Sequence, residues 1–574
     1  MRQHYEAELA YLRELGEAFS RANPDVAPLL GSRANDPDVE RLMEAFAFLT
    51  GRLRQRAEEH LPDLAQGLIG MLWPHYLRPL PSLTVLRFDA PQAGGEAMVP
   101  AGAQVSSRPV DGITCRFRTA HAMPLVPARV AALELEERAA SATLTLQLEA
   151  TAGATAAQLA HRSVRLFLHG PREPEPGPQL LHALLRHCVG VRVGDGTRWL
   201  SVPSTALRHA GLEEAVLPWP DNGFPGYRVI QEYLAFPARM LFLDLPAVPG
   251  AERLQGTRLV WEFRLDRRPD LPARPTAEHL QLNCVPALNL FPMSARPLLP
   301  SPDRFEHRVQ PQDGHAEMRV HSVDAAEGRI QGRAERLAFP AFASYEHARS
   351  GAAGLFRMVR LRPAVVGRGA DMWVSFVGGD GAAVLPAVDA ITLSLTCTDG
   401  EAAGRIPLGA LDQAGPGCPP GLGVRNVVPV TPEAAPPLGG DLMWRLVAGL
   451  SRAMQPVTDL GALRALLSAY AFRALHEEPE RQRLRLLLDG LRSISAHPLS
   501  TVVKGVPVHG REIRLVVAES GFGGIAGAWL FGTALDAFLA TRAAINTVSR
   551  LVVVGEETRS EMRWPIRAGQ APIP

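Results

Sequence analysis

Hydrophobic residues near the amino terminus recur at the spacing of a helix face. Tyr5, Leu9, Leu12, Gly16 and Phe19 follow one another at alternating intervals of four and three residues. Side chains at this spacing share one face, because an α-helix has about 3.6 residues per turn. The pattern therefore predicts an amphipathic helix at the start of the chain.

A second and a third helix are predicted before residue 80. Asp36 is suited to cap a helix, and Pro37 is suited to begin it. The third helix is expected to start at Pro62 and to end in WPHYLRPLP, whose three prolines stop helical structure. The apolar stripe of the second helix consists of Val39, Leu42, Phe46, Leu49 and Leu53.

These apolar stripes have two interpretations, and the pattern does not choose between them. Three helices can pack into a small core of their own, although a chain of about 80 residues seldom buries enough surface alone. The same spacing also suits a bundle shared with the helices of another chain. In the second interpretation, the candidate partner-binding residues are Leu9, Leu12, Phe19, Val39, Leu42, Phe46 and Leu49.

From Ser82 to about Pro429 the pattern changes from helical to alternating. Short runs of alternating apolar and polar residues are separated by proline and glycine, which is typical of antiparallel β structure. The pattern predicts two β-rich domains, 81–250 and 251–430, with few helices. The clearest strand candidates are LTVLRF, ATLTLQL, RSVRLFLHG, TRLVWEFRL, DMWVSFV and DAITLSLTC.

Helical spacing returns after Asp441. The amphipathic segments are DLMWRLVAGLSRAM, DLGALRALLSAYAFRAL and ERQRLRLLLDGLRSI. Two predicted strands follow, TVVKGVPVH and GREIRLVVAES, and then a helix and the strand SRLVVVG. The predicted fold class is therefore α+β with several domains: a helical bundle segment over 1–80, the two β-rich domains, and a C-terminal α/β domain over 431–574.

The segment GFPGYRVIQEYLAFPARMLFL, Gly223 to Leu243, concentrates aromatic residues among prolines and glycines. The prolines and glycines predict an irregular connection between strands. Aromatic rings provide a large contact area. Two roles stay open for Tyr227, Tyr233 and Phe236: a core corner of one β domain, or a surface that binds a partner.

The overall composition narrows the class of protein. The chain of 574 residues has 60 basic and 59 acidic side chains, so its net charge of +1 gives no electrostatic case for nucleic acid or an anionic membrane as partner. Its five cysteines lie far apart, which fits a reducing cytoplasm. The best membrane-spanning candidate, GAWLFGTALDAFLAT, is short and contains Asp536. We expect a cytoplasmic protein without direct membrane insertion.

One motif resembles a cofactor site. GFGGIA, Gly521 to Ala526, matches the dinucleotide pattern G-x-G-x-x-A between a predicted strand and a predicted helix. Too few residues follow it for a complete dinucleotide-binding sheet, so the pattern favours a glycine-rich turn that packs a helix on a sheet. The single lysine, Lys504, precedes Gly505 rather than the Ser or Thr of a phosphate-binding loop.

His182, His187 and Cys188 are the nearest approach to a metal cluster. The two histidines are five residues apart, which on a helix would turn them away from each other. We therefore predict no metal site, no cofactor and no catalytic residue.

Several motifs, taken in order, resemble one known family. They begin with HYEAELAYLRELGEAFSRANPDVAPLL and continue through LIGMLWPHYLRPLPSLTVLRF, GYR-x-x-QEY-x-AFP, LNCVPALNLFP, LTCTDG and WLFGTALDAFLAT. The motifs and their order resemble those of the TssF (ImpG/VasA) family of type VI secretion baseplate proteins. The resemblance covers nearly the whole chain. Two segments depart from the family pattern, CTDGEAAGRIP and TRAAINTV. Contacts made by those two segments in the family are not carried over.

The resemblance implies a cytoplasmic scaffold, not an enzyme, docked at the inner membrane as part of the secretion apparatus. In such an assembly two copies join one TssG subunit and, with TssE and TssK, form a wedge. Six neighbouring wedges surround the spike hub and nucleate tube and sheath assembly. The implied fold is similar to that of contractile phage baseplate wedge proteins. The alternatives are a wedge protein of another contractile injection particle and a nucleotide-binding enzyme that uses the 521–526 turn.

Overall fold

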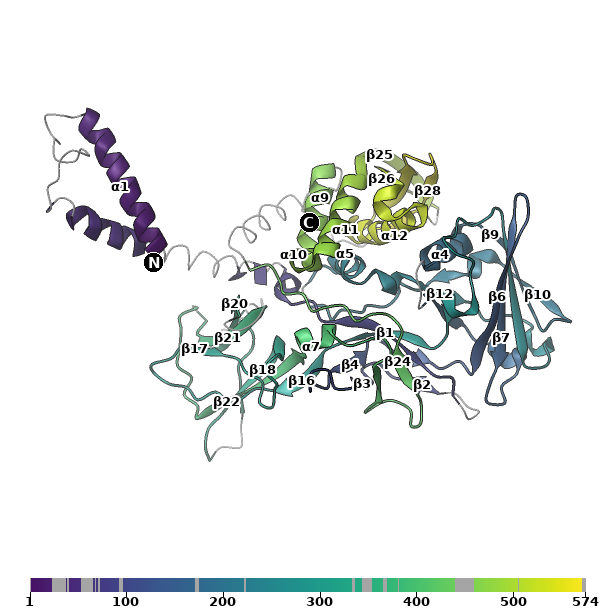
Figure 1. Cartoon of the computed structure of the whole chain (residues 1–574), viewed down its shortest axis with the longest axis horizontal. Helices are drawn as coiled ribbons and strands as arrows, with labels where there is room; N and C mark the ends of the chain where they lie inside the picture. Colours follow the sequence, from purple (N-terminus) through teal and green to yellow (C-terminus); the bar gives the residue numbers. More distant parts are fainter. Residues whose placement is uncertain are drawn as a thin grey trace. The chain divides into compact units, whose positions relative to one another are not determined.

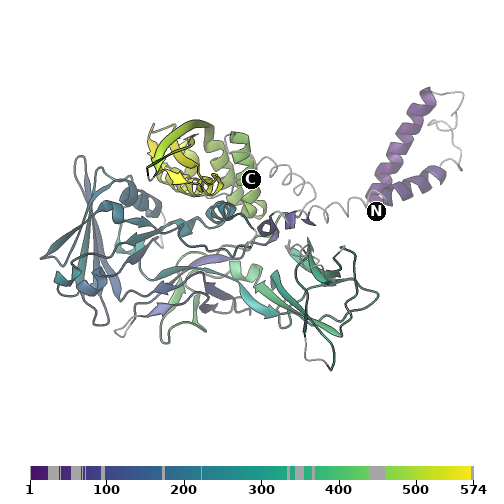
Figure 2. The ribbon, with the colours of Figure 1, turned by 180° about the vertical axis from the view of Figure 1, so that it is seen from behind.

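The computed structural model divides the chain into two compact units (Figures 1 and 2). The helical unit contains Met1–Leu72 with Pro437–Ala448, and the main unit contains Trp73–Pro436 with Gly449–Pro574. The residues that the structure describes are 2–22, 38, 41–52, 66–67, 69–70, 73–91, 97–170, 175–220, 223–332, 336–342, 354–364, 369–379, 381–438, 459–503 and 505–569.

The helical unit begins with α1, Arg2–Ala22, which confirms the helix expected at the start of the chain. A second helical segment covers 41–52, where Thr50 Oγ1 donates a hydrogen bond to the carbonyl oxygen of Phe46 at 2.8 Å. Short helical pieces fall within the third predicted helix, at 66–67 and 69–70. Asp36, Val39 and most of the third helix lie outside the described residues.

The six-stranded sheet of the main unit, here called the barrel sheet, takes its strands from distant parts of the sequence. Their order is β23-β3-β4-β15-β1-β24. The two outer strands meet through Asn426, whose Oδ1 accepts the N–H of Leu411 at 3.1 Å, so the sheet curves toward closure. The strands are β1 (Leu83–Phe88), β3 (Gln104–Ser107), β4 (Arg116–Thr119), β15 (Cys284–Leu288), β23 (Leu411–Ala414) and β24 (Val424–Asn426).

The interior of the barrel sheet is apolar because alternate residues of its strands point inward. In β1 the side chains of Leu86 and Phe88 are buried in the core, whereas Arg87 lies between them on the outer face. β1 confirms the predicted strand LTVLRF. Shorter elements border this sheet: η2 (Pro74–Leu77), β2 (Met98–Val99), β5 (Met123–Pro124) and α7 (Glu401–Gly404).

Two further sheets carry three of the predicted strands, in β7, β8 and β13. Their orders are β10-β9-β13-β7-β6 and β11-β12-β8-β14. β13 pairs with both β7 and β9, so strand pairing runs across the predicted boundary at 250/251. The strands are β6 (Ala128–Glu137), β7 (Ala142–Ala150), β8 (Val164–Leu168), β9 (Cys188–Gly194), β10 (Trp199–Val202), β11 (Arg208–His209), β12 (Phe242–Leu245), β13 (Arg258–Leu265) and β14 (Leu280–Gln281). The helices of this region are α3 (Ala156–Ala160), α4 (Gly177–Arg186), η3 (Ser204–Ala206), α5 (Pro225–Ala235), η4 (Pro237–Met240), η5 (Ala251–Arg253) and η6 (Ala277–His279).

The strands between Phe291 and Thr398 form two smaller antiparallel sheets. Their orders are β16-β22-β18-β19 and β17-β21-β20, and β21 and β22 confirm the predicted strands DMWVSFV and DAITLSLTC. The strands are β16 (Phe291–Ser294), β17 (Glu306–Arg308), β18 (Arg319–Arg329), β19 (Arg336–Ala338), β20 (Phe356–Pro363), β21 (Ala370–Val377) and β22 (Ala390–Thr398).

The C-terminal part is α/β, with a sheet in the order β25-β26-β27-β28 and β29 beside β27. Helix α12 lies against β27, and β27 runs parallel to β26. The elements are α9 (Leu460–Tyr470), α10 (Phe472–His476), α11 (Glu478–Gly490), β25 (Leu491–Val503), β26 (Val506–Val517), η7 (Glu519–Phe522), α12 (Ile525–Arg542), β27 (Val548–Gly555), β28 (Glu561–Arg563) and β29 (Arg567–Ala568).

Two sequence predictions are corrected in this C-terminal part. The predicted helix ERQRLRLLLDGLRSI ends at Gly490, and its last four residues begin β25. The predicted strands TVVKGVPVH and GREIRLVVAES are not separate, because β25 and β26 form one long hairpin whose pairing runs from Leu491 with Val517 to Val503 with Val506. Gly505 has a φ of 83°, a value that glycine tolerates and other residues rarely adopt.

The architecture is the predicted mixture of helical, β-rich and α/β parts, and the predicted fold class is confirmed. Within the described ranges, no helix has both the length and the apolar character needed to cross a membrane. The apolar segment GAWLFGTALDAFLAT lies in α12, and most of its side chains are buried within the main unit. Its Asp536 is paired with Arg567, whose Nε lies 2.5 Å from Oδ2.

Candidate partner-binding surface

The helical segment 41–52 exposes an apolar face. Leu42, Phe46 and Leu49 are 71%, 58% and 57% exposed, and their spacing places them on one side of the helix. Ala47, on another side, is fully buried. Burying such a Leu or Phe side chain is worth about 1.5–3 kcal/mol, so this face gains free energy only when another surface covers it.

Helix α1 presents a different face from the one that the sequence pattern predicts. Leu9 and Leu12 are partly buried, whereas Phe19 is exposed. The exposed large residues are Tyr11, Leu15 and Phe19, at intervals of four residues. Tyr11 and Leu15 were not predicted to belong to this face, because the prediction followed only the stripe with alternating intervals of four and three residues.

The aromatic residues of the 223–243 segment lie in the interior. Tyr227, Tyr233 and Phe236 are only 6%, 6% and 2% exposed. The ring of Tyr227 stacks on Tyr470 at a centroid distance of 5.1 Å, and that of Tyr233 lies 5.9 Å from Phe531. Of the two roles left open for these residues, their burial favours the core.

The prediction of an irregular connection over this segment is wrong, because residues 225–235 form helix α5. Pro225 occupies the first turn of a helix, where its missing N–H costs nothing. Gly226 allows α5 to approach α12 closely, since a Cβ at this position would lie 2.2 Å from Thr541 Oγ1. The residues that suggested a loop are therefore a helix start and a helix-packing contact.

A buried ion pair joins α5 to η4, and both of its side chains also form hydrogen bonds with the loop before α5. The carboxylate of Glu232 contacts the guanidinium of Arg239, and both side chains are buried. Glu232 Oε1 also accepts the backbone N–H groups of Val216 and Leu217 at 3.0 and 2.8 Å. Arg239 Nε donates to the carbonyl oxygen of Gly211 at 2.9 Å. The pair was not predicted, because Glu232 and Arg239 meet through a fold that the local sequence pattern does not reveal.

The residues that directly follow the helical unit in the chain are locked into the main unit by aromatic stacking. The ring of His75 stacks on Trp219 at 4.1 Å, and its Nε2 lies 2.8 Å from Tyr470 Oη. Tyr76 meets Tyr470 edge-on at 5.8 Å. Burial, and then the nearby Arg78, lower the pKa of His75 to about 3, so its imidazole is neutral at physiological pH.

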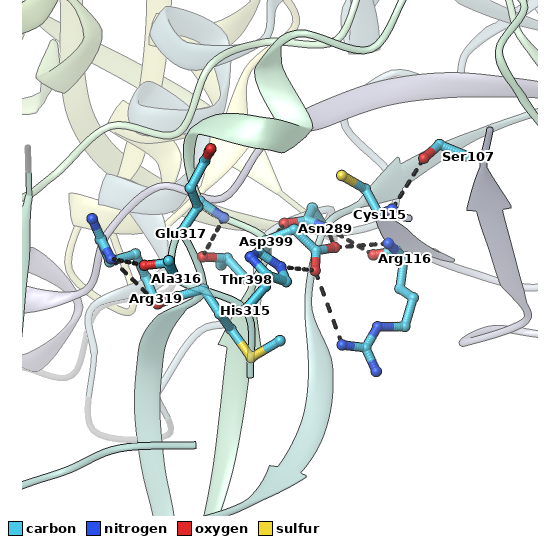
Figure 3. Close-up of polar contacts among 12 residues, drawn as sticks. Ser107, Cys115, Arg116, Asn289, His315, Ala316, Glu317, Arg319, Thr398 and Asp399 are labelled. Carbon is cyan, nitrogen blue, oxygen red and sulfur yellow. Dashed lines mark hydrogen bonds and ion pairs between the residues drawn. The ribbon is translucent and has the colours of Figure 1, made fainter. Parts of the chain in front are cut away.

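Asp399 joins the barrel sheet to the sheet that contains β22 (Figure 3). Its fully buried Oδ2 accepts hydrogen bonds from the backbone N–H of Arg116 and from Asn289 Nδ2, each at 2.7 Å. Asn289 Oδ1 accepts the N–H of Asp399 at 2.7 Å, and His315 Nε2 lies 3.1 Å from Asp399 Oδ1. This carboxylate therefore fixes two sheets against each other.

The GFGGIA turn has the strand–turn–helix context of a dinucleotide site, since it connects β26 to α12 and β27 is parallel to β26. Its glycines nevertheless have packing and conformational roles. A Cβ on Gly521 would lie 2.6 Å from the carbonyl oxygen of Leu486, and Gly523 and Gly524 have φ values of 76° and 98°.

Carboxylates occupy the space around this turn where a cofactor phosphate would need positive charge. Glu557 accepts the backbone N–H of Ser520 at 3.1 Å, and the carboxylate of Glu519 accepts the N–H of Glu557 at 2.9 Å. A pyrophosphate prefers free N–H groups at a helix N-terminus, without competing anions. The residues present do not fit a dinucleotide.

The histidines considered for metal binding lie closer together than predicted. The rings of His182 and His187 are 5.1 Å apart because α4 ends at Arg186 and His187 leaves the helical spacing. His187 Nδ1 lies 3.1 Å from Asp266 Oδ1, and burial lowers the pKa of His182 to about 3. Within the part of the chain that the structure describes, no group of three His, Cys, Asp or Glu side chains could hold a metal ion.

Comparison with known proteins identifies the family. The family described as "Type VI secretion system, TssF" matches residues 1–571. The chain belongs to the TssF family. It is 30% identical to "Type VI secretion system component TssF1" of Pseudomonas aeruginosa, over 99% of each chain. The resemblance found in the sequence motifs is confirmed.

Two solved structures share this fold. A chain in the TssK-TssF-TssG baseplate subcomplex of a type VI secretion system, determined by cryo-electron microscopy, matches with a TM-score of 0.77 and 26% identity, over 92% of this chain and 98% of that chain. A chain in the baseplate complex from the type VI secretion system matches with a TM-score of 0.63 and 26% identity, over all of both chains.

Proposed function

We propose that this chain is a structural subunit of the type VI secretion baseplate wedge. Two copies join one TssG subunit and bind TssK and TssE, and neighbouring wedges enclose the spike hub. The assembly nucleates the tube and the sheath. The chain acts in the cytoplasm, at the face of the inner membrane where the apparatus docks, and it catalyses no reaction.

The observation that carries this proposal is the exposed apolar face of Leu42, Phe46 and Leu49 on a chain whose main unit has a filled interior. Obligate interfaces resemble a core cut in two and bury about 2,000 Å² or more. The exposed stripes of α1 and of the 41–52 helix supply such a half-core. TssG and the second copy of this chain supply the other half.

Charge substitution at Phe46 tests this surface. Phe46→Glu places a charge in the centre of the proposed interface, and we expect it to abolish co-purification with TssG while the main unit still unfolds cooperatively at the same denaturant concentration. The matched control is Phe305→Glu, which changes a phenylalanine of similar exposure in the main unit. If Phe46→Glu co-purifies with TssG as well as the parent chain does, the helical face is not the interface.

Mass measurement of the co-expressed complex tests the stoichiometry. A mass equal to two copies of this 62.0 kDa chain and one TssG is expected. A one-to-one complex would contradict the two-copy wedge while leaving the contact itself intact.

A wedge protein of another contractile injection particle is the second candidate, because such particles use similar wedge proteins. Genes for TssG, TssK and the membrane complex beside this one would favour secretion. A nucleotide-binding enzyme is disfavoured because Glu519 and Glu557 surround the only dinucleotide-like turn found in the sequence. Binding of a nucleotide to the purified chain would reverse that judgement.

A further inference from the structure

A groove with a volume of about 670 Å³ lies where the barrel sheet meets the edges of two other sheets. One wall consists of β1 and β24 of the barrel sheet. The other consists of the first residues of β6 and the η6–β14 segment. β24, β6 and β14 are each the last strand of their sheets. Figure 1 shows β1 and β24 side by side.

Two arginines face each other in this groove. Arg87 on β1 and Arg425 on β24 are directly opposite in the antiparallel register. Like charges at opposite positions destabilise a sheet. Among the described residues, neither guanidinium group has a hydrogen bond or an ion pair. Burial, and then the charge of Arg425, lower the pKa of Arg87, and the nearby carboxylate of Asp89 offsets only part of this effect.

Three other polar side chains of the groove already have hydrogen-bond or ion-pair partners. Asn283 Oδ1 accepts the N–H of Val126 at 2.8 Å, and Gln281 Nε2 donates to the carbonyl oxygen of His169 at 2.8 Å. Arg129 contacts Glu149. The acidic side chains that line the groove are Asp89 and Glu278. The two opposed arginines are therefore the groups that a ligand can satisfy.

We propose that this groove binds an acidic segment of a different baseplate subunit, with a carboxylate seated between Arg87 and Arg425. A guanidinium group binds a carboxylate through two parallel hydrogen bonds, and the added negative charge removes the repulsion between the two arginines. Ala128, Leu282 and the exposed Leu408 provide apolar surface for the neighbouring side chains of the segment. The inference rests on the proposed function, because it takes the occupant from the assembly.

A polypeptide fits this groove better than nucleic acid does. Nucleic acid binding requires a series of cations along a phosphate backbone. Here two arginines lie at opposite positions of paired strands, and Asp89 and Glu278 line the same groove, so a polyanion would also meet two carboxylates that repel it. A single carboxylate between apolar residues matches the available charge.

Photo-cross-linking in the assembled complex tests the proposal. Leu408 is replaced by the photoreactive residue p-benzoylphenylalanine, and the chain is co-expressed with TssG, TssK and TssE. We expect a cross-link to a peptide of one of these subunits that contains aspartate or glutamate next to the linked residue. The control carries the same residue at Val189, an exposed position outside the groove, and gives no such cross-link.

Arg425→Gln separates a binding role from a structural one. The substitution should lower the cross-linked yield about tenfold, the effect of losing a charge-assisted contact. It should leave the melting temperature of the free chain unchanged or raise it, because it removes a like-charge pair. Arg425→Lys keeps the charge and should lose less of the yield. A fall in melting temperature with Arg425→Gln would show a structural arginine and overturn the proposal.

The remaining outcomes are also decisive. If the complex forms but the groove cross-links to a neutral or basic segment, to a second copy of this chain or to nothing, the groove proposal fails and the proposed function stands. If the parent chain forms no complex with TssG, TssK and TssE, the proposed function fails, and the groove proposal fails with it.

Discussion

The helical unit and the main unit place the same kinds of side chain in opposite environments. Phe46 in the helical unit faces outward, whereas Phe236 in the main unit is packed inside. The main unit fills its own interior, with ion pairs and hydrogen bonds holding its sheets together. The comparison teaches that the frequency of aromatic residues does not distinguish an uncovered apolar face from a packed core, whereas the exposure of the side chains does.

The largest expected effect comes from breaking the buried pair of the main unit. Glu232→Ala leaves the Arg239 charge buried and two backbone N–H groups without an acceptor. We expect the free energy of unfolding to fall by about 3–5 kcal/mol, measured by chemical denaturation. The control, Glu252→Ala, removes an exposed carboxylate 3.9 Å from His161 and should cost no more than about 1 kcal/mol. If both variants lose the same free energy of unfolding, the buried Glu232–Arg239 pair does not stabilise the interior of the main unit.

A matched pair of phenylalanine variants tests the comparison directly. Phe236→Ala should destabilise the free chain by roughly 3–4 kcal/mol, because it empties a packed site. Phe46→Ala should change the stability of the free chain little, and should weaken binding to TssG instead. Denaturation of the free chain and co-purification are measured for both. The distinction between the two units is lost if Phe46→Ala unfolds the free chain as readily as Phe236→Ala does.

Asp399→Asn tests the junction between two sheets of the main unit. The new amide NH₂ would face donors that now bond to a carboxylate, namely the N–H of Arg116 and the side chain of Asn289. A loss of about 2 kcal/mol is expected in the unfolding free energy. Asp303→Asn, at an exposed position, serves as the control. No difference between the two variants would mean that the carboxylate does not hold the sheets.

Lowering the pH should destabilise the main unit, and each buried histidine should contribute less than the substitutions described above. Burial lowers the pKa of His75, His182 and His321 to about 3 in the folded chain, from an ordinary value of 6.5. The unfolded state then binds more protons, so this stability is present above pH 6.5 and is lost as the pH falls toward 3. At pH 5.5 each group should cost about 1.4 kcal/mol relative to neutral pH.

Denaturation midpoints at pH 7.5 and 5.5 measure this acid sensitivity. His75→Phe keeps an aromatic ring in the stack with Trp219 and should reduce the difference between the two midpoints by the share of one group. If His75→Phe leaves the difference between the two midpoints unchanged, His75 is not buried as a neutral group.

Alternation and periodicity predicted local structure well in this protein. The runs LTVLRF and TRLVWEFRL became β1 and β13. In β1 every residue except Arg87 is buried, whereas buried and less buried residues alternate in the second half of β13. The order of strands could not be predicted, since β1 pairs with β15 and β24 from distant parts of the chain. Helix α5 was missed because Pro225 and Gly226, taken as breakers, instead start the helix and allow its contact with α12.

The candidate surface was predictable only in part. Helical spacing identified the stripe of Leu42, Phe46 and Leu49, but spacing says nothing about whether a face is covered within its own chain. The Glu232–Arg239 pair and the opposed arginines of the groove depend on tertiary contacts between segments that no local pattern connects. These contacts became visible only in three dimensions.

The strand order of the barrel sheet also constrains how the protein is made. The neighbours of β1 are encoded at 284–288 and 424–426, so a ribosome adding about 5–20 residues per second leaves this strand without its last partner for roughly 20–70 s. The helices with the exposed apolar face emerge even earlier. The nascent polypeptide therefore exposes the apolar face of the helical unit before the barrel sheet is complete. We expect that a chaperone, or early binding of the partner, covers this face during synthesis and prevents aggregation.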